Sequence, residues 1–143
     1  MQSTKPRLAI VGTGMSGLAC ADGLREYFEI SLFDKSRGLS GRLSTRRADA
    51  HAFDHGAQYF RAGTELFAKW LESFETDGHL QAWTPRHVHF APDGSHEVRR
   101  DESSKLVFVS GMSAVGKALL ANRPKWKLHL DCAVDLVSGH AGE

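Results

Sequence analysis

Three glycines at the spacing G-x-G-x-x-G constrain the fold of this chain more than any other feature. They directly follow a short apolar run at 7–11, and they are Gly12, Gly14 and Gly17. An apolar run that stops at glycine predicts a buried strand. The proline-free segment 15–28 predicts a helix, and the run 30–34 predicts a second strand. Strand, glycine turn, helix and strand form a βαβ unit, in which the strands are parallel.

Each position of the glycine motif has a physical role in binding a dinucleotide. Gly12 permits a tight turn, Gly14 lets backbone amides approach a pyrophosphate, and Gly17 lets the helix pack closely on the strand. The helix that begins at Met15 offers N–H groups and a partial positive charge to the phosphates. Ser16 adds a hydroxyl donor. The motif and its setting therefore predict a dinucleotide-binding site.

An acidic residue at the end of the second predicted strand extends this site. Asp34 lies about 20 residues after the first glycine, where a carboxylate accepts hydrogen bonds from the adenosine ribose. The glycine motif alone does not separate FAD from NAD. Asp34 would repel a 2′-phosphate, so an NADP site would depend on Lys35 and Arg37 and is the weaker alternative.

The loop after Asp34 resembles the segment that follows the ribose-binding acid in flavin amine oxidases. There R-x-G-G-R precedes a Ser or Thr; here the loop reads Arg37-Gly-Leu-Ser-Gly-Arg42, with one more residue between the two arginines, followed by Leu-Ser-Thr. The resemblance implies that Gly41 and Arg42 hold the FAD pyrophosphate, for which a guanidinium is well suited. Ser40 replaces the first glycine of the usual pair, and we expect it to stiffen the loop.

A third segment is similar to the D-x-G-A-Q-Y stretch of the renalase-like oxidoreductases of bacteria, which runs past the flavin ring. It reads Asp54-His-Gly-Ala-Gln-Tyr59. The resemblance implies that Gln58 and Tyr59 contact FAD and that the small Gly56 and Ala57 let the backbone lie close to the isoalloxazine. With the phrases FDKSR at 33–37 and GMSA at 111–114, the likeness to this branch of the flavin amine oxidases covers nearly the whole chain.

The resemblance implies a flavin-dependent oxidoreductase. FAD would take a hydride from a small-molecule substrate, a dihydronicotinamide isomer of NAD(P)H or an amine, and O2 would reoxidise it to give hydrogen peroxide. Members of this family are considerably longer, so we expect the chain to be the N-terminal part of a two-domain flavoprotein. The sequence identifies no catalytic acid or base. The alternatives are a nucleotide-binding module without turnover and an NAD(P)-dependent dehydrogenase domain.

The whole chain is predicted to form one α/β domain with a Rossmann-like FAD-binding fold and a small antiparallel β section. Its 143 residues leave little room for a second full domain. We assign 6–60 and 105–137 to the core and 61–104 to the start of a substrate-domain insertion. The other predicted elements are a helix at 64–76, short antiparallel strands between 81 and 109 with a turn at 92–94, a helix at 113–121 with Ser113 as N-cap, and a strand at 126–132 that joins the parallel sheet.

Composition gives no reason to propose nucleic acid or a membrane as a partner. The formal net charge is only +1, and no apolar run approaches the ~18 residues that span a bilayer. The two cysteines, Cys20 and Cys132, are far apart in sequence and are interpreted as small buried residues in a reducing compartment. No signal-peptide pattern is visible, so the cytoplasm is the expected location.

Two further expectations concern metals and association. His51, Asp54 and His55 have helical metal-ligand spacing, but the adjacent glycine and the resemblance favour a strand, so no metal site is predicted. Because most of a substrate domain is expected to be missing, we predict exposed apolar surface and self-association. The expected surfaces are the sheet edge beyond Val134 and one face of the 64–76 helix, which carries Phe67, Trp70, Leu71 and Phe74.

Overall fold

The computed structural model describes residues 5–100, 103–122 and 126–138, and its centre is a parallel sheet of three strands. The sheet has the order β1-β2-β9. Strands β1 and β2 pair in parallel over their full lengths, with Leu8 opposite Ile30, and β9 continues the sheet with Leu128 opposite Leu32. The strands are β1 (Arg7–Val11), β2 (Glu29–Phe33) and β9 (Lys127–His129). This arrangement confirms the predicted βαβ unit and the predicted third strand.

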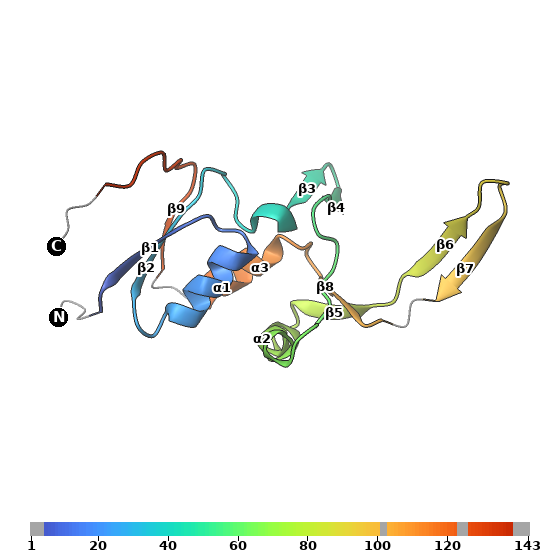
Figure 1. Cartoon of the computed structure of the whole chain (residues 1–143), viewed down its shortest axis with the longest axis horizontal. Helices are drawn as coiled ribbons and strands as arrows, with labels where there is room; N and C mark the ends of the chain where they lie inside the picture. The colour runs from blue at the N-terminus through green and yellow to red at the C-terminus, as the bar shows by residue number, and fades with distance from the viewer. Residues whose placement is uncertain (1–4, 101–102, 123–125, 139–143) are drawn as a thin grey trace.

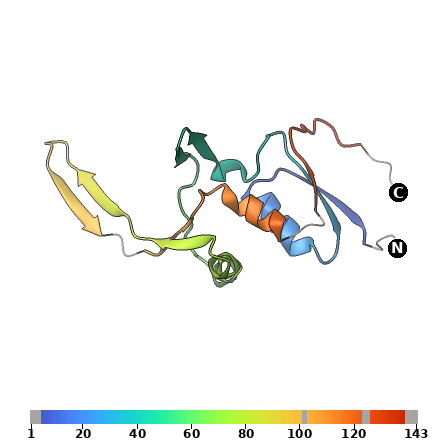
Figure 2. The ribbon, with the colours of Figure 1, turned by 180° about the vertical axis from the view of Figure 1, so that it is seen from behind.

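Two helices lie side by side on one face of this sheet, as Figures 1 and 2 show from opposite sides. They are α1 (Met15–Leu24) and α3 (Ala114–Ala121). Leu18 of α1, Leu32 of β2 and Val115 of α3 are each fully buried, and Met112 fills the space before α3. The helices and the sheet therefore share one apolar core, as expected when crossover connections return along the same face.

A third helix, α2, extends this core over an antiparallel strand pair. The elements are α2 (Glu65–Thr76), β5 (Leu80–Trp83) and β8 (Lys105–Phe108). Helix α2 begins after Thr64, whose hydroxyl accepts a hydrogen bond of 3.3 Å from the Phe67 N–H. The expectation that its apolar face is exposed is wrong. Leu71 is 1% and Phe74 3% exposed, because the Phe74 ring packs 5.4 Å from that of Phe108 on β8.

The predicted antiparallel section is confirmed, and part of it forms an arm. Strands β6 (Arg86–Phe90) and β7 (His96–Arg100) pair in a hairpin around the predicted turn. Figures 1 and 2 show this arm at the opposite end of the molecule from the three-stranded sheet. Phe90 is 69% and Val98 57% exposed. A smaller hairpin, β3 (Thr45–Ala48) and β4 (His51–Asp54), lies near the centre.

Several local predictions need correction. Helix α1 ends at Leu24 and not at residue 28: Arg25 is its C-cap, and the Tyr27 N–H closes a tighter three-residue turn on the Leu24 carbonyl at 3.0 Å. The interpretation of both cysteines as buried is wrong: Cys20 is exposed and Cys132 is half-buried, and both thiols are free.

The exposed apolar surface expected beyond Val134 is present, since Leu136 is 83% exposed. Among the described residues, no helix is long and apolar enough to cross a membrane.

Helix α3 has an N-cap from outside its own segment. Ser113 occupies the N-cap position, but its side chain makes no capping bond. Instead the hydroxyl of Ser40 accepts a hydrogen bond of 3.2 Å from the Gly116 N–H and donates one of 2.9 Å to the Ser113 carbonyl. The loop after β2 and the crossover helix are thereby joined.

Two glycines of α1 provide a matched test of the fold. A Cβ on Gly17 would lie 2.0 Å from the Gly12 carbonyl oxygen, whereas a Cβ on Gly23 would meet nothing within 4 Å. We expect Gly17→Ala to lower the free energy of unfolding by about 1–3 kcal/mol through overpacking. Gly23→Ala should raise it by roughly 0.5–1 kcal/mol, because alanine favours a helix. Urea denaturation measures both, and equal effects of the two variants would contradict the close packing.

Candidate dinucleotide-binding site

The first glycine loop has the geometry that the motif predicts. Gly12 adopts φ +100°, a conformation that favours glycine, and its N–H donates to the Phe33 carbonyl at 2.7 Å. A Cβ added to Gly17 would lie 2.0 Å from the Gly12 oxygen, so helix and loop touch backbone to backbone. The turn and close-packing roles predicted for these glycines are therefore confirmed.

The N-terminal end of α1 is open toward this loop. The first intrahelical bond runs from the Leu18 N–H to the Gly14 carbonyl at 3.0 Å, so the N–H groups of residues 15–17 have no intrahelical acceptor. A Cβ on Gly14 would meet nothing within 4 Å. Among the described residues, no side chain caps this end and no acid stands in its first turn. Its partial positive charge is available to an anion such as a pyrophosphate.

Asp34 directly follows β2 and is held by hydrogen bonds. Its Oδ2 accepts from both the N–H and the hydroxyl of Thr13 at 2.6 Å, and its Oδ1 accepts from the Ser36 N–H at 2.8 Å. Burial acts to raise the pKa of Asp34, but the bonds from Thr13 and Ser36 outweigh it and lower the pKa from 3.8 to about 2. The carboxylate is therefore ionised at neutral pH, while its contact with a ribose stays a prediction. Lys35 beside it is exposed.

The second loop packs directly on the first. The Ser40 N–H donates to the Thr13 carbonyl at 2.9 Å. A Cβ on Gly41 would lie 3.1 Å from the Cα of Gly14, so the two loops meet at their glycines. Ser40 itself is fully buried with φ 80°, a conformation that glycine adopts at lower cost. Ser40 also makes two hydrogen bonds to the α3 end, while the expected stiffening of the loop stays a prediction.

The third segment packs on the second in the same way. Arg42 lies in a short 3-10 turn, η1 (Gly41–Leu43), with its side chain exposed. Its carbonyl accepts a 2.9 Å bond from the Ala57 N–H, and a Cβ on Gly56 would lie 1.9 Å from that carbonyl oxygen. Ala57 and Gln58 are exposed and Tyr59 is half-buried. The structure thus brings all three predicted segments together, while their contacts with FAD remain predictions.

Tyr59 is surrounded by residues that the sequence analysis did not single out. The Trp83 ring lies 6.0 Å away, and the Lys105 Nζ and the Arg61 guanidinium lie 5.2 and 5.5 Å from the Tyr59 ring centroid. Lys105 is only 1% exposed, and its Nζ is 3.0 Å from His87 Nε2. The β5–β8 pairing, which joins segments distant in sequence, creates this cluster. The only feature of the sequence that could have pointed to this cluster is Lys105, which stands at the start of an apolar run.

The histidine-rich segment does not form the helix that metal-ligand spacing would need. Residues 51–54 form strand β4, in which the rings of His51 and Phe53 lie 6.2 Å apart. Within residues 5–100, 103–122 and 126–138, no three His, Cys, Asp or Glu side chains are grouped so that they could hold a metal ion.

Comparisons with known proteins support the fold. A family model described as an NAD(P)-binding Rossmann-like domain matches residues 10–80. A structure of putrescine oxidase bound to putrescine matches with a TM-score of 0.51 and 21% identity over 71% of this chain and 23% of that chain. A CLA-producing fatty acid isomerase from P. acnes matches with a TM-score of 0.54 and 21% identity over 86% of this chain and 29% of that one. The predicted Rossmann-like α/β fold is confirmed.

The chain spans only 23% and 29% of the lengths of the two solved structures. Their similarity at 21% identity shows the fold alone.

The lowered pKa of Asp34 predicts a pH dependence of stability. A carboxyl whose folded pKa is about 2 instead of 3.8 stabilises the fold above about pH 4. That contribution should be lost as the pH falls from about 4 through about 2. Thr13→Val removes the hydroxyl donor but keeps the N–H donor, so it should raise the Asp34 pKa part of the way toward 3.8. Carboxyl NMR titration measures this pKa, and an unchanged value in Thr13→Val would contradict the assignment.

Proposed function

We propose that this chain is the FAD-binding part of a flavin-dependent oxidoreductase. The observation that carries the proposal is the backbone contact among the three predicted segments. Gly41 lies against Gly14, and Gly56 lies against the Arg42 carbonyl. One continuous strip thus runs from Asp34, past the open end of α1, to Gln58 and Tyr59. A cofactor with adenosine at one end and a ring system at the other needs a strip of this kind.

The same strip favours FAD over NAD(P). The glycine motif, the α1 end and an acid after β2 suit either cofactor. The segments with Arg42 and with Gln58 and Tyr59 lie beyond the dinucleotide motif, and they resemble flavin-binding segments. Asp34, with a pKa of about 2, is ionised and would repel the 2′-phosphate of NADP. An NAD(P)-dependent dehydrogenase domain therefore remains the weaker alternative.

The residues present fit a bound FAD. The exposed Arg42 side chain would contact the pyrophosphate together with the N–H groups of residues 15–17, and Asp34 would accept from the ribose. Gly56 and Ala57 are exposed and small, so an isoalloxazine could lie close to their backbone, as the resemblance implies. Bound FAD would supply hydride acceptance and reoxidation by O2. The resemblance to renalase-like proteins favours a dihydronicotinamide isomer as the substrate, with amines as the other class.

Equilibrium titration tests this proposal. FAD added to the protein should show changed flavin absorbance and quenched fluorescence with a saturable dissociation constant. Excess NADH should compete weakly. If NADPH or NADH binds and FAD does not, the chain is a nicotinamide-binding domain and the proposal is wrong.

Arg42 and Arg46 form a matched pair for the pyrophosphate contact. Both side chains are exposed, but only Arg42 lies in the turn that contacts the first glycine loop. Arg42→Ala should weaken FAD binding by roughly 1.5–3 kcal/mol, the worth of a hydrogen bond to a charged group. Arg46→Ala should change it by less than about 0.5 kcal/mol. Equal dissociation constants for Arg42→Ala and the wild type would remove Arg42 from the site.

The exposed β6–β7 arm leads to a prediction on self-association of the chain. Val88 faces Val98 and Phe90 faces His96 across β6–β7, and period-two alternation puts these side chains on one face. Since Phe90 and Val98 are largely exposed, we expect the chain to self-associate. Phe90→Ser with Val98→Ser should reduce association in light scattering, whereas Leu66→Ser, at an 82% exposed site on α2, should not. Association that is unchanged in the double variant would contradict a role for the arm.

The alternative that we keep open is a nucleotide-binding module without turnover. On this alternative we expect little hydrogen peroxide from this chain with added FAD and dihydronicotinamide isomers, even where FAD binds. A monomer with rapid peroxide production would show that these residues make a complete oxidase site.

A further inference from the structure

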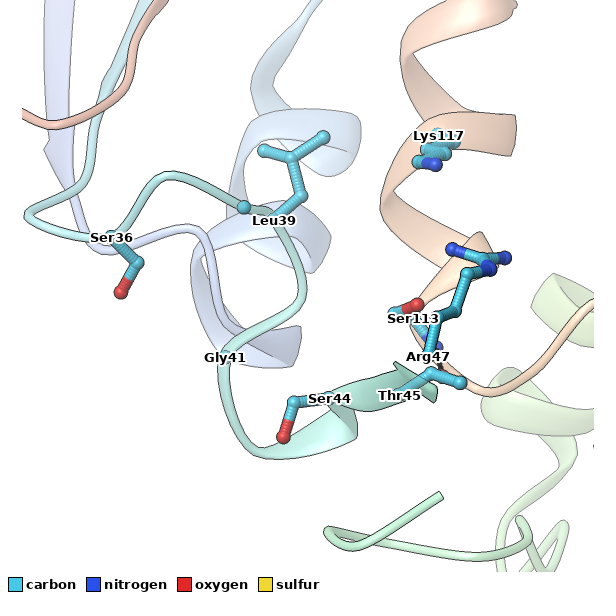
Figure 3. Close-up of a pocket in the computed structure, with 9 residues that line it drawn as sticks. Ser36, Leu39, Gly41, Ser44, Thr45, Arg47, Ser113 and Lys117 are labelled. Carbon is cyan, nitrogen blue, oxygen red and sulfur yellow. Dashed lines mark hydrogen bonds between the residues drawn. The ribbon is translucent and has the colours of Figure 1, made fainter. Parts of the chain in front are cut away.

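An open cavity lies on the α3 side of the second loop, and Gly41, which contacts Gly14 of the first loop, is part of its lining. Its volume is about 360 Å³, within the range of ligand pockets. The loop, strand β3 and the N-terminal turns of α3 form its wall, as Figure 3 shows. Ser36, Ser44 and Ser113 are among its lining residues, together with the cationic Arg47 and Lys117. Figure 3 shows Ser113 beside Arg47, whereas the Ser36 and Ser44 hydroxyls are directed away from the two cations.

Its two cations come from different elements and face the same opening. Arg47 lies on β3 and Lys117 on α3, and Figure 3 shows the Arg47 guanidinium extended along α3 toward Lys117. The Arg47 Nη2 donates to the Ser110 carbonyl at 3.3 Å, which holds one edge of the guanidinium. No carboxylate is among the described residues that line the cavity. Two like charges thus share one opening without a counter-ion from its wall.

The α3 end itself contributes few donors. The Ser113 N–H bonds to Thr45 Oγ1 at 3.0 Å, and the N–H groups of Ala114 and Gly116 bond to the Gly111 carbonyl and to Ser40 Oγ. The Thr45 hydroxyl in turn donates to Asp54. Recognition of an anion therefore depends on Arg47 and Lys117, with the Ser113 hydroxyl as a further donor, and not on free amides of the helix.

We propose that this cavity binds a phosphate group of a nucleotide or diphosphate ligand. A phosphate carries a charge of about −1.5 to −2 and three acceptor oxygens, which match two cations and the adjacent Ser113 hydroxyl. A carboxylate would leave one cation uncompensated. Arg47 would bind two oxygens through its planar fork, and Lys117 would act as a point charge. The volume of about 360 Å³ exceeds that of phosphate alone, so part of a larger ligand would enter with it.

Two sources of the phosphate are chemically equivalent here. Gly41 lines the cavity and also contacts Gly14, so one source is an FAD diphosphate that lies on the α3 side of Gly41 instead of at the α1 end, and in that case the inference rests on the proposed function. A second ligand, such as a free nucleotide, is the other. The experiment therefore uses FAD, ADP and inorganic pyrophosphate as separate probes in equilibrium dialysis.

A matched pair of double variants isolates the cavity. Arg47→Gln with Lys117→Gln removes both cations from the opening. Arg46→Gln with Lys69→Gln removes the same charge at two exposed sites outside it, on β3 and α2. All four side chains are exposed, so both variants should fold, as circular dichroism checks. We expect the cavity variant to weaken binding of at least one probe by about tenfold or more, and the control variant by less than about twofold.

The pattern over the probes identifies the source. Loss confined to FAD means that the cavity holds the flavin diphosphate. Loss of ADP and pyrophosphate binding with unchanged FAD binding means that it holds a second ligand. Loss for ADP in a protein that binds no FAD supports the cavity while contradicting the proposed function. Equal effects of the two double variants, or no binding of any probe by the wild type, would overturn the inference.

Discussion

The half of this protein that carries the glycine loops depends on three close approaches between two backbones, and two of them leave no room for a side chain. They are the contacts of Gly17 with Gly12, of Gly41 with Gly14, and of Gly56 with Arg42. In two of them a Cβ would lie within about 2 Å of a carbonyl oxygen, and relief would require a backbone shift. Each contact fixes one segment on the previous one. The strip on which the FAD proposal rests is therefore a consequence of backbone packing, before any polar side chain acts.

Polar side chains then fix the loops that the glycines bring together. Thr13 is fully buried, and its N–H and hydroxyl both donate to Asp34, which joins the first loop to the end of β2. Ser40 joins the second loop to α3, whose residues lie more than 70 positions later in the chain. Since α3 leads to β9, the hydroxyl of Ser40 also connects the loop to the third strand of the sheet. A glycine at this position would relax the backbone but would leave the α3 end without its cap.

Local sequence patterns predicted the elements and the glycine geometry but not the long-range contacts. The 7–11 and 30–34 runs and the spacing of Gly12 and Gly17 specify a βαβ unit, because its parts are adjacent in sequence. Thr13 and Lys105 were missed, since one occupies a variable position of the motif and the other acquires its partners only through the β5–β8 pairing. The cavity cations Arg47 and Lys117 come from elements that meet only after the crossover. The FAD contacts themselves stay predictions.

The misjudged face of α2 shows why an incomplete match to longer structures need not expose a core. The periodicity of α2 correctly indicated one apolar face, but the partner of that face lies within this chain. Phe60 and Phe108 pack on Phe67 and Phe74, with ring centroids 5.8 and 5.4 Å apart in the two pairs. The arm has no such partner among the described residues. A two-stranded hairpin with one apolar face is marginally stable alone in water. Association should therefore act through β6–β7, at the far end from the glycine loops, and nucleotide binding need not depend on it.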